Sequence, residues 1–195
     1  NIAILVLMKL SKGYNRIKTK KGGIILNKRQ DVVTMGGSKM TLLGDEIKVG
    51  DKAPEFTLLK TDLSPYSLSD AGNKVKIISV VPSLDTGVCE LQTIKFNEMA
   101  SELGDVVILT ISEDLPFAQA RFCGAQGIDK VITLSDHMET EFGLKYGFLM
   151  EELRLLARGI VVLDQDNNVK YVEYVGEATN HPDYDKAYEA AKALI

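Results

Sequence analysis

Short apolar runs alternate with amphipathic segments along most of this chain. Two β-branched runs, at residues 75–81 and 106–111, are each followed by a stretch with helical spacing of apolar residues, and a third run lies at 131–134. Runs of this length and composition are typical of buried strands. Because strand–helix–strand repeats of this spacing form right-handed crossovers, the pattern predicts an α/β fold built on a parallel sheet.

The remaining patterns complete the expected set of elements. The expected helices span about 86–103, 114–123, 139–146 and 184–194. The first of them is only partly amphipathic, since Gln92 and Lys95 interrupt its apolar stripe. Alternating residues around Gly44 and Asp45 predict a β-hairpin over 41–49, and a second hairpin is expected over 159–175.

Charge divides the chain near residue 30. Eight of the 23 Lys and Arg residues, and none of the 27 Asp and Glu residues, fall in the first 30 positions. We expect residues 1–34 to be a basic leader that is disordered or foreign to the natural protein, because the chain begins with Asn and has Met35 and Met40 just before its patterned region. Residues 35–195 suffice for one hydrophobic core, so we expect a single domain there.

Composition favours an ordinary globular protein. Apolar residues make up 45% of the chain, and no apolar run reaches the length of about 18 residues that a membrane span needs. The apolar run at 2–8 lacks the basic start and the cleavage site of a signal peptide. A basic leader can contact nucleic acid or an anionic membrane, but we expect neither partner and place the protein in the cytoplasm.

One of the two cysteines stands where a buried strand meets a helix. Pro82 ends the strand, Thr86 is a suitable N-cap, and Cys89 is then the third residue of the first helical turn. Backbone N–H groups of that turn have no intrahelical acceptor, and together with the helix dipole they favour a thiolate, the form of cysteine that attacks. From its position alone, Cys89 is either a nucleophile or a small buried apolar residue.

The residues around Cys89 resemble the active-site signature of the peroxiredoxins, Pro-x-x-x-Thr-x-x-Cys. The longer string SVVPSLDTGVC at 79–89 is similar to the thiol peroxidase subfamily, of the atypical two-cysteine type. The resemblance covers about residues 40–195 and includes VGDKAPEF at 49–56, DLPFAQARFC at 114–123 and LARG at 156–159. It implies a thioredoxin-like fold, here with an N-terminal β-hairpin extension, and a peroxidase activity.

Cleavage of a peroxide O–O bond requires a nucleophile, a donor for the attacked oxygen, and positive charge near the departing oxygen. The resemblance implies that Cys89 attacks and becomes a sulfenic acid, and that Thr86 aims its hydroxyl at the sulfur and the peroxide. It also implies that Pro82 shields the pocket from water and that Arg158 supplies the positive charge. Without the resemblance, Thr86 would be an ordinary N-cap, Pro82 a strand terminator and Arg158 a solvated surface charge.

The second cysteine, Cys123, matches the resolving cysteine of this subfamily. It stands 34 positions after Cys89 and just before Gly124, a suitable helix stop. The resemblance implies that Cys123 converts the sulfenic acid to an intramolecular disulfide, which thioredoxin then reduces. It also implies that hydrogen peroxide and organic hydroperoxides are the substrates and that the protein is a homodimer. A disulfide needs Cα atoms within about 7 Å. We therefore expect the segment around Cys123 to unfold locally and to be weakly stable.

Two alternatives compete with the peroxidase interpretation. The two cysteines and two histidines lack the paired spacing of a zinc site, and the sequence has no glycine-rich phosphate loop, so we expect neither metal nor cofactor. A redox sensor or binding protein on the same scaffold would form the same disulfide. Catalytic turnover with a reductant distinguishes an enzyme from such a sensor.

Overall fold

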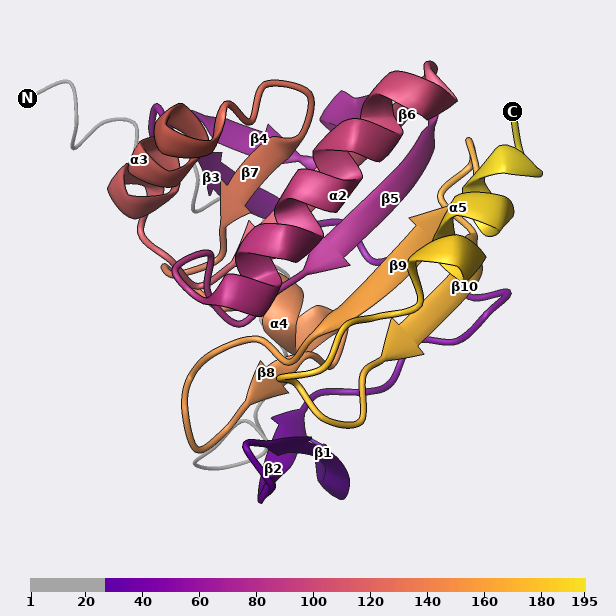
Figure 1. Ribbon diagram of the computed structural model, residues 1–195. Helices are drawn as coiled ribbons and strands as arrows, with labels where there is room; N and C mark the ends of the chain where they lie inside the picture. Colours follow the sequence, from indigo (N-terminus) through magenta and orange to yellow (C-terminus); the bar gives the residue numbers. More distant parts are fainter. Residues whose placement is uncertain (1–26) are drawn as a thin grey trace, which may run out of the picture.

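Three parallel strands form the centre of the computed structural model, which describes residues 27–195: β5 (Val75–Val80), β6 (Val106–Ser112) and β7 (Ile132–Ser135). Helix α2 (Gly87–Leu103) connects β5 to β6, and α3 (Pro116–Gln126) connects β6 to β7 (Figure 1). All six residues of β5 are buried, including Lys76 and Ser79, which explains why its apolar residues do not alternate with exposed polar ones. The α/β architecture with parallel crossovers is as expected.

Antiparallel strands extend this centre on both sides into a seven-stranded sheet of order β10-β9-β5-β6-β7-β3-β4. A separate three-stranded sheet has the order β1-β2-β8. The remaining strands are β1 (Lys28–Met35), β2 (Ser38–Leu43), β3 (Thr57–Lys60), β4 (Pro65–Ser67), β8 (Leu149–Met150), β9 (Gly159–Leu163) and β10 (Val169–Tyr174). The remaining helices are the 3-10 helix η1 (Leu68–Ala71), α4 (Glu141–Lys145) and α5 (Tyr184–Lys192).

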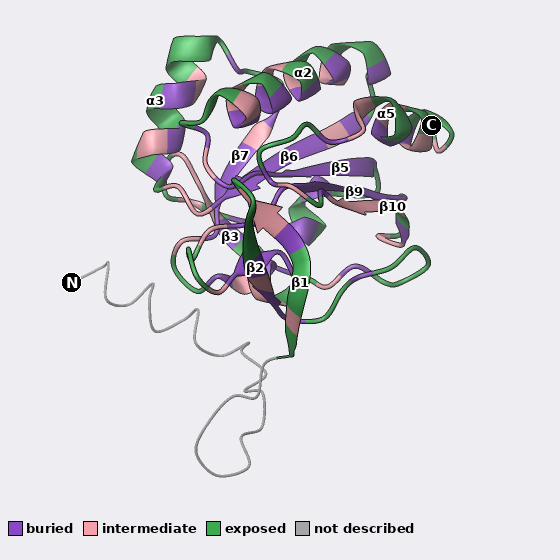
Figure 2. Ribbon diagram, turned by 60° about the horizontal axis from the view of Figure 1, so that its bottom comes forward, coloured by how far each residue is buried: buried purple, intermediate pink, exposed green. Residues whose placement is uncertain are grey.

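The two faces of the large sheet carry different layers. Helices α2, α3 and α5 cover one face, and the hairpin of β1 and β2 lies below the other (Figure 2). On the helical face, Ile77 and Ile108 pack with Phe96 of α2, and on the opposite face Ile78 and Leu109 belong to the core cluster that includes α4 and the N-terminal hairpin. The sheet is therefore buried between two apolar cores.

The N-terminal hairpin does not lie where the sequence pattern predicted it. β1 pairs with β2 across a turn at Gly36 and Gly37, whose φ angles of +58° and +79° suit a two-residue hairpin turn. The predicted hairpin over 41–49 is therefore wrong. Gly44 serves a different purpose, because a Cβ there would lie 2.0 Å from the carbonyl oxygen of Leu144.

The expected domain boundary at residue 34 is also wrong, since β1 crosses it. Val33 is 1% exposed, and Thr34 pairs with a distant segment, donating from its N–H to Gly176 O (2.7 Å) and accepting from the N–H of Ala178 (2.8 Å). The change in charge along the sequence predicts a boundary here, but charge does not determine where a strand begins. Backbone hydrogen bonds and buried side chains do, and they include residues 28–34 in the domain. Residues 1–26, the rest of the expected leader, lie outside the described residues.

Helix α3 continues beyond the stop expected at Gly124. It ends at Gly127, which has left-handed angles (φ 63°, ψ 34°) and donates its N–H to the carbonyl oxygen of Cys123. Gly124 and Gly127 are both suitable helix stops, and the helix ends at Gly127 because that glycine adopts the left-handed conformation. Cys123 therefore lies within α3 rather than at its last residue.

Across residues 27–195, no helix has both the length and the apolar character needed to cross a membrane.

Candidate active site

The candidate site residues come together at one edge of the large sheet. Val80, the last residue of β5, pairs with Gly159, the first residue of the antiparallel strand β9. The loop that follows β5 and the residue that precedes β9, Arg158, therefore lie at the same edge. This is the carboxyl edge of the parallel strands, where ligands bind in open α/β sheets.

The sulfur of Cys89 receives two hydrogen bonds. Cys89 is fully buried, and its Sγ accepts from Thr86 Oγ1 at 2.8 Å and from Arg158 Nη2 at 3.0 Å. Thr86 occupies the N-cap position of α2 but makes no side-chain cap bond, and its hydroxyl reaches the sulfur and, at 3.3 Å, the carbonyl oxygen of Ser83. Helix start, hydroxyl and guanidinium therefore surround the sulfur with hydrogen-bond donors and positive charge.

Arg158 is not a surface charge, because only 2% of it is exposed. Its Nε donates to Ala178 O at 2.7 Å, and its Nη1 donates to Gln92 Oε1 at 2.6 Å. A buried guanidinium is costly unless its N–H groups are paired. These two acceptors satisfy that need and direct the third nitrogen at the sulfur.

Gln92 is a site residue that sequence reasoning missed. It is fully buried on α2, and its Nε2 donates to Ser79 Oγ of β5 at 2.8 Å while its Oε1 holds Arg158. The available signal was its interruption of an apolar stripe three residues after Cys89, which places both side chains on the same helix face. A buried amide at such a position needs a polar partner, and here the partner is Arg158.

Pro82 is buried directly after the last backbone bond of its strand. The N–H of Val81 donates to Ile111 O at 3.1 Å, and Pro82 has no N–H with which to continue the ladder. The chain then turns into the loop that carries Thr86. Pro82 therefore ends the strand and stands at the entrance to that loop.

Cys123 is separate from Cys89 in this structure. Both thiols are free, and Cys123 Sγ lies 3.5 Å from Thr133 Oγ1 on β7. Strand β6 lies between β5 and β7, which separates those two strands by about 10 Å. Because Cys123 is also seven residues into α3, about 10 Å along its axis, a disulfide with Cys89 requires part of α3 to unwind.

Comparisons with known proteins assign this chain to a family. A family model described as Redoxin matches residues 48–188. The chain is 60% identical over 163 residues to the thiol peroxidases of Halalkalibacterium halodurans and of Bacillus subtilis, which covers 84% of this chain and 98% of each relative. The chain belongs to the thiol peroxidase subfamily of the peroxiredoxins.

Solved structures agree with this membership. A peroxiredoxin-like protein from Aquifex aeolicus is 40% identical with a TM-score of 0.80, covering 87% of this chain and 99% of that one. The thiol peroxidase from Chromobacterium violaceum is 22% identical with a TM-score of 0.75, covering 83% and 95%, and shows the likeness of the fold. The expected thioredoxin-like fold with an N-terminal hairpin is confirmed.

Tyr184 of α5 borders the thiol peroxidase site. Its ring packs edge-on against Phe96 with 5.8 Å between centroids, and its hydroxyl lies 2.8 Å from His181 Nδ1. Burial raises the pKa of Tyr184 to about 12, an effect that Arg158 opposes and Cys89 reinforces. Tyr184 is therefore a neutral phenol close to Arg158 and Cys89.

Two acidic residues follow β6 and β7 at the same edge. The charge of Asp136 acts on the buried Glu113, and Asp136 itself accepts from the N–H groups of Phe142 and Gly143 at 3.0 and 2.7 Å. Burial, and then the charge of Asp136, raise the pKa of Glu113 to about 8. Burial also raises the pKa of Asp136, against those backbone bonds. The pair therefore retains a proton at neutral pH.

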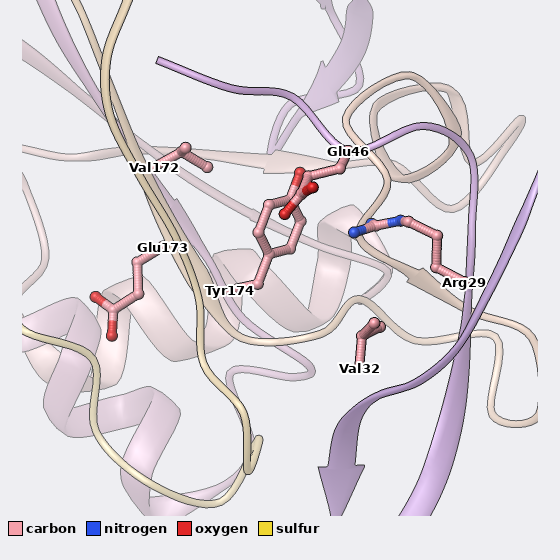
Figure 3. Close-up of a pocket in the computed structure, with 6 residues that line it drawn as sticks. All are labelled: Arg29, Val32, Glu46, Val172, Glu173 and Tyr174. Atoms are coloured by element: carbon pink, nitrogen blue, oxygen red, sulfur yellow. The ribbon is translucent and has the colours of Figure 1, made fainter.

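A hollow of about 470 Å³ lies elsewhere, between the N-terminal hairpin and β10. Its lining includes Arg29, Glu46 and Tyr174, as Figure 3 shows. Arg29 lies 4.9 Å above the ring of Tyr174 and donates to the carbonyl oxygens of Gly44 and Gly147, so its side chain holds the hairpin to the sheet. None of the lining residues belongs to the site around Cys89.

Within the described part of the chain, no three His, Cys, Asp or Glu side chains gather closely enough to hold a metal ion.

Proposed function

We propose that this protein is an enzyme that reduces hydrogen peroxide and organic hydroperoxides, with Cys89 as the nucleophile. The observation that carries the proposal is the convergence of Thr86 Oγ1 (2.8 Å) and Arg158 Nη2 (3.0 Å) on the buried sulfur. Donors placed in this way can also hold an oxygen atom that approaches the sulfur. Membership of the thiol peroxidase subfamily supports the same reaction.

In the first step, the Cys89 thiolate attacks one peroxide oxygen. An S–O bond forms as the O–O bond breaks, and the departing alkoxide or hydroxide takes up a proton to become an alcohol or water. The sulfur is oxidised to a sulfenic acid while the peroxide is reduced. Thr86 donates to the attacked oxygen, Arg158 stabilises the developing negative charge, and Pro82 shields the sulfur from water.

In the second step, the Cys123 thiol attacks the sulfenic sulfur of Cys89. An S–S bond forms, and the sulfenic oxygen leaves as water. This step requires part of α3 to unwind, because Cys123 is held next to Thr133 on β7. A thioredoxin dithiol then reduces the disulfide through a mixed disulfide and is itself oxidised, which returns both cysteines to thiols.

We further propose a cytoplasmic homodimer. Leu91, Leu115 and Phe117, on or beside the first turns of α2 and α3, have exposed fractions of 54–59%. Exposed apolar side chains favour association with another protein surface. Sedimentation at several concentrations tests the dimer.

A coupled assay with thioredoxin, thioredoxin reductase and NADPH tests the enzyme against the redox-sensor alternative. We expect continuous NADPH oxidation with hydrogen peroxide and with organic hydroperoxides. A sensor would be oxidised once and would not turn over. A single burst without turnover would therefore contradict the proposed function.

Mass spectrometry of peroxide-treated protein tests the two-cysteine mechanism. The wild type should lose two hydrogen atoms on forming the disulfide, and Cys123→Ser should gain one oxygen and later a second. Cys89→Ser should not change. If Cys123→Ser turned over with thioredoxin like the wild type, Cys123 would be a structural residue and the resolving step would be wrong.

A further inference from the structure

Asp114, between β6 and α3, holds the loop that leads to Cys89. Its Oδ1 accepts from Ser83 Oγ at 2.7 Å, and its Oδ2 accepts from the N–H of Leu84 at 2.7 Å and from Ser112 Oγ at 2.8 Å. Hydrogen bonds to a carboxylate are stronger than those between neutral groups. One side chain therefore joins the loop after β5 to the end of β6.

The bonds to Asp114 lie close to the hydroxyl that serves the sulfur. The loop is attached once at Val81, whose N–H donates to Ile111 O, and a second time at Ser83 and Leu84. Thr86 follows the second attachment by two residues and is itself exposed. Because so short a tether leaves little freedom, the position of the Thr86 hydroxyl depends on the second attachment.

Asp114 is itself held from two further elements. Ser135 at the end of β7 donates its hydroxyl to Asp114 O, and Gln119 of α3 donates to Ser112 Oγ at 3.1 Å. Ser112 thus contacts both Asp114 and the helix that carries Cys123. These bonds hold the backbone of Asp114 in place, and with it the carboxylate that binds the loop.

We infer that Asp114 is a positioning residue, whose carboxylate holds the 83–84 segment so that the Thr86 hydroxyl points at the Cys89 sulfur and at the peroxide oxygen bound there. This inference rests on the proposed peroxidase function. The hydrogen bonds of the Asp114 carboxylate reach Ser83, Leu84 and Ser112 and not the sulfur, so Asp114 acts through the loop. It should therefore affect the reaction with peroxide more than the general reactivity of the thiolate, which Arg158 supports separately.

Asp114→Asn tests the inference, because the amide keeps one acceptor oxygen and loses the other. Both it and the reference protein should carry Cys123→Ser, so that only the first step is measured. We expect the second-order rate with hydrogen peroxide to fall at least about tenfold, since a misplacement of about 1 Å at a reacting centre can cost a hundredfold. The rate of alkylation by iodoacetamide, which needs the thiolate but no oxygen donor, should change little.

Asp164→Asn is the matched control. Asp164 also holds a loop, accepting from the N–H groups of Asp166 and Asn168 at 3.0 and 2.8 Å, but it follows β9 at the end opposite Arg158. Its removal should leave the peroxide rate unchanged. Ser83→Ala should cause part of the loss seen in Asp114→Asn, and adding it to Asp114→Asn should cause little further loss, because the two share one bond.

The outcomes separate this inference from the proposed function. A reference protein that does not react with peroxide would overturn the proposed function. A normal peroxide rate in Asp114→Asn, or an equal loss of peroxide and alkylation rates, would overturn the positioning role while the peroxidase remained. If Asp114→Asn failed to fold, Ser83→Ala alone would decide, and a normal peroxide rate in that variant would overturn the inference.

Discussion

Arg158 uses its three nitrogens on three different parts of the fold. Nε is held by the carbonyl of Ala178, Nη1 by the amide of Gln92, and Nη2 faces the sulfur of Cys89. The planar guanidinium fixes the angles between these bonds, so holding two nitrogens sets the direction of the third. The same charge on a flexible chain would not have that property.

Arg158→Lys tests the value of this geometry. Lysine keeps the positive charge but lacks the fork, so the rate of Cys89 with peroxide should fall by about a hundredfold, the usual scale for losing one oriented donor. Stopped-flow measurement of peroxide consumption gives this rate. Arg121→Lys, on the exposed side of α3, is the control and should react normally. A normal rate in Arg158→Lys would mean that charge alone suffices.

Gln92→Leu should weaken the site through Arg158. Leucine fills a similar volume but leaves Nη1 without its acceptor, and we expect the peroxide rate to fall about tenfold. Gln92→Glu keeps an acceptor for Arg158 and should lose less activity, although it no longer donates to Ser79. Equal rates in both variants would show that the amide oxygen has no part in orienting Arg158.

At the scale of residues, the sequence was sufficient where a local motif brings groups together. Thr86 and Cys89 lie on one turn, so their spacing permits the contact that the resemblance implied. The partners of Arg158 are different, because Gln92 and Ala178 meet it only when α2, β9 and the segment after β10 are assembled. The spacing of residues along the sequence does not predict these contacts of Arg158.

At the scale of elements, the N-terminal hairpin supports the segment that holds Arg158. The Glu177 carboxylate accepts from the N–H groups of Gly36 and Gly37 at 3.0 and 2.9 Å, and the neighbouring Ala178 pairs with Thr34. The bond from the N–H of Gly37, with bonds from the hydroxyl and the N–H of Thr179, holds the pKa of Glu177 well below its usual range. The turn of the hairpin therefore holds Glu177, the residue before Ala178, whose carbonyl oxygen accepts from Arg158.

Truncation through Met35 should reveal this support. It removes β1 and the buried Val33, and we expect Tm to fall by several degrees, at about 2–4 °C for each kcal/mol of lost burial. The peroxide rate should fall as well, because Ala178 loses its pairing with Thr34. Removal of residues 1–26 is the control and should change neither quantity, since no described site residue belongs to it. An active, equally stable protein lacking β1 would refute this role for the hairpin.

Helices and strands could be predicted where burial leaves a regular pattern of apolar residues in the sequence. The parallel strands were predicted from their largely apolar runs because they are buried at the centre of the sheet, whereas the stripe of α2 is interrupted by Gln92, which is buried against Arg158. The hairpin was predicted at the wrong residues for two reasons. β1 is largely exposed and shows little apolar periodicity, and several glycines nearby are each suited to a turn. Its position depends on distant contacts that only the folded chain provides.

At the scale of the whole molecule, the Glu113–Asp136 pair links stability to pH. Burial and Asp136 raise the pKa of Glu113 from an ordinary value of 4.5 to about 8, although Arg154 opposes the shift. The folded state therefore keeps a proton that the unfolded state releases. Stability from this pair is fully present below pH 4.5 and is lost as the pH rises toward about 8.

Glu113→Gln should remove this dependence. Glutamine has a similar shape and stays neutral, so the variant should gain stability relative to the wild type as the pH is raised from 5 to about 8. Thermal unfolding across that range measures the difference. Glu98→Gln, on the exposed face of α2, should run parallel to the wild type. A constant offset between Glu113→Gln and the wild type would show that Glu113 is already ionised at neutral pH.

The pairing of Thr34 with Gly176, 142 residues apart, also determines when the site can form during synthesis. Cys89 leaves the ribosome long before Ala178, the acceptor that orients Arg158, and contacts of such large sequence separation form late in folding. A nascent chain that ends before Ala178 therefore carries Cys89 without a guanidinium held in place beside its sulfur. Under the proposed function, full reactivity toward peroxide would therefore arrive only once the last part of the chain has been made and folded.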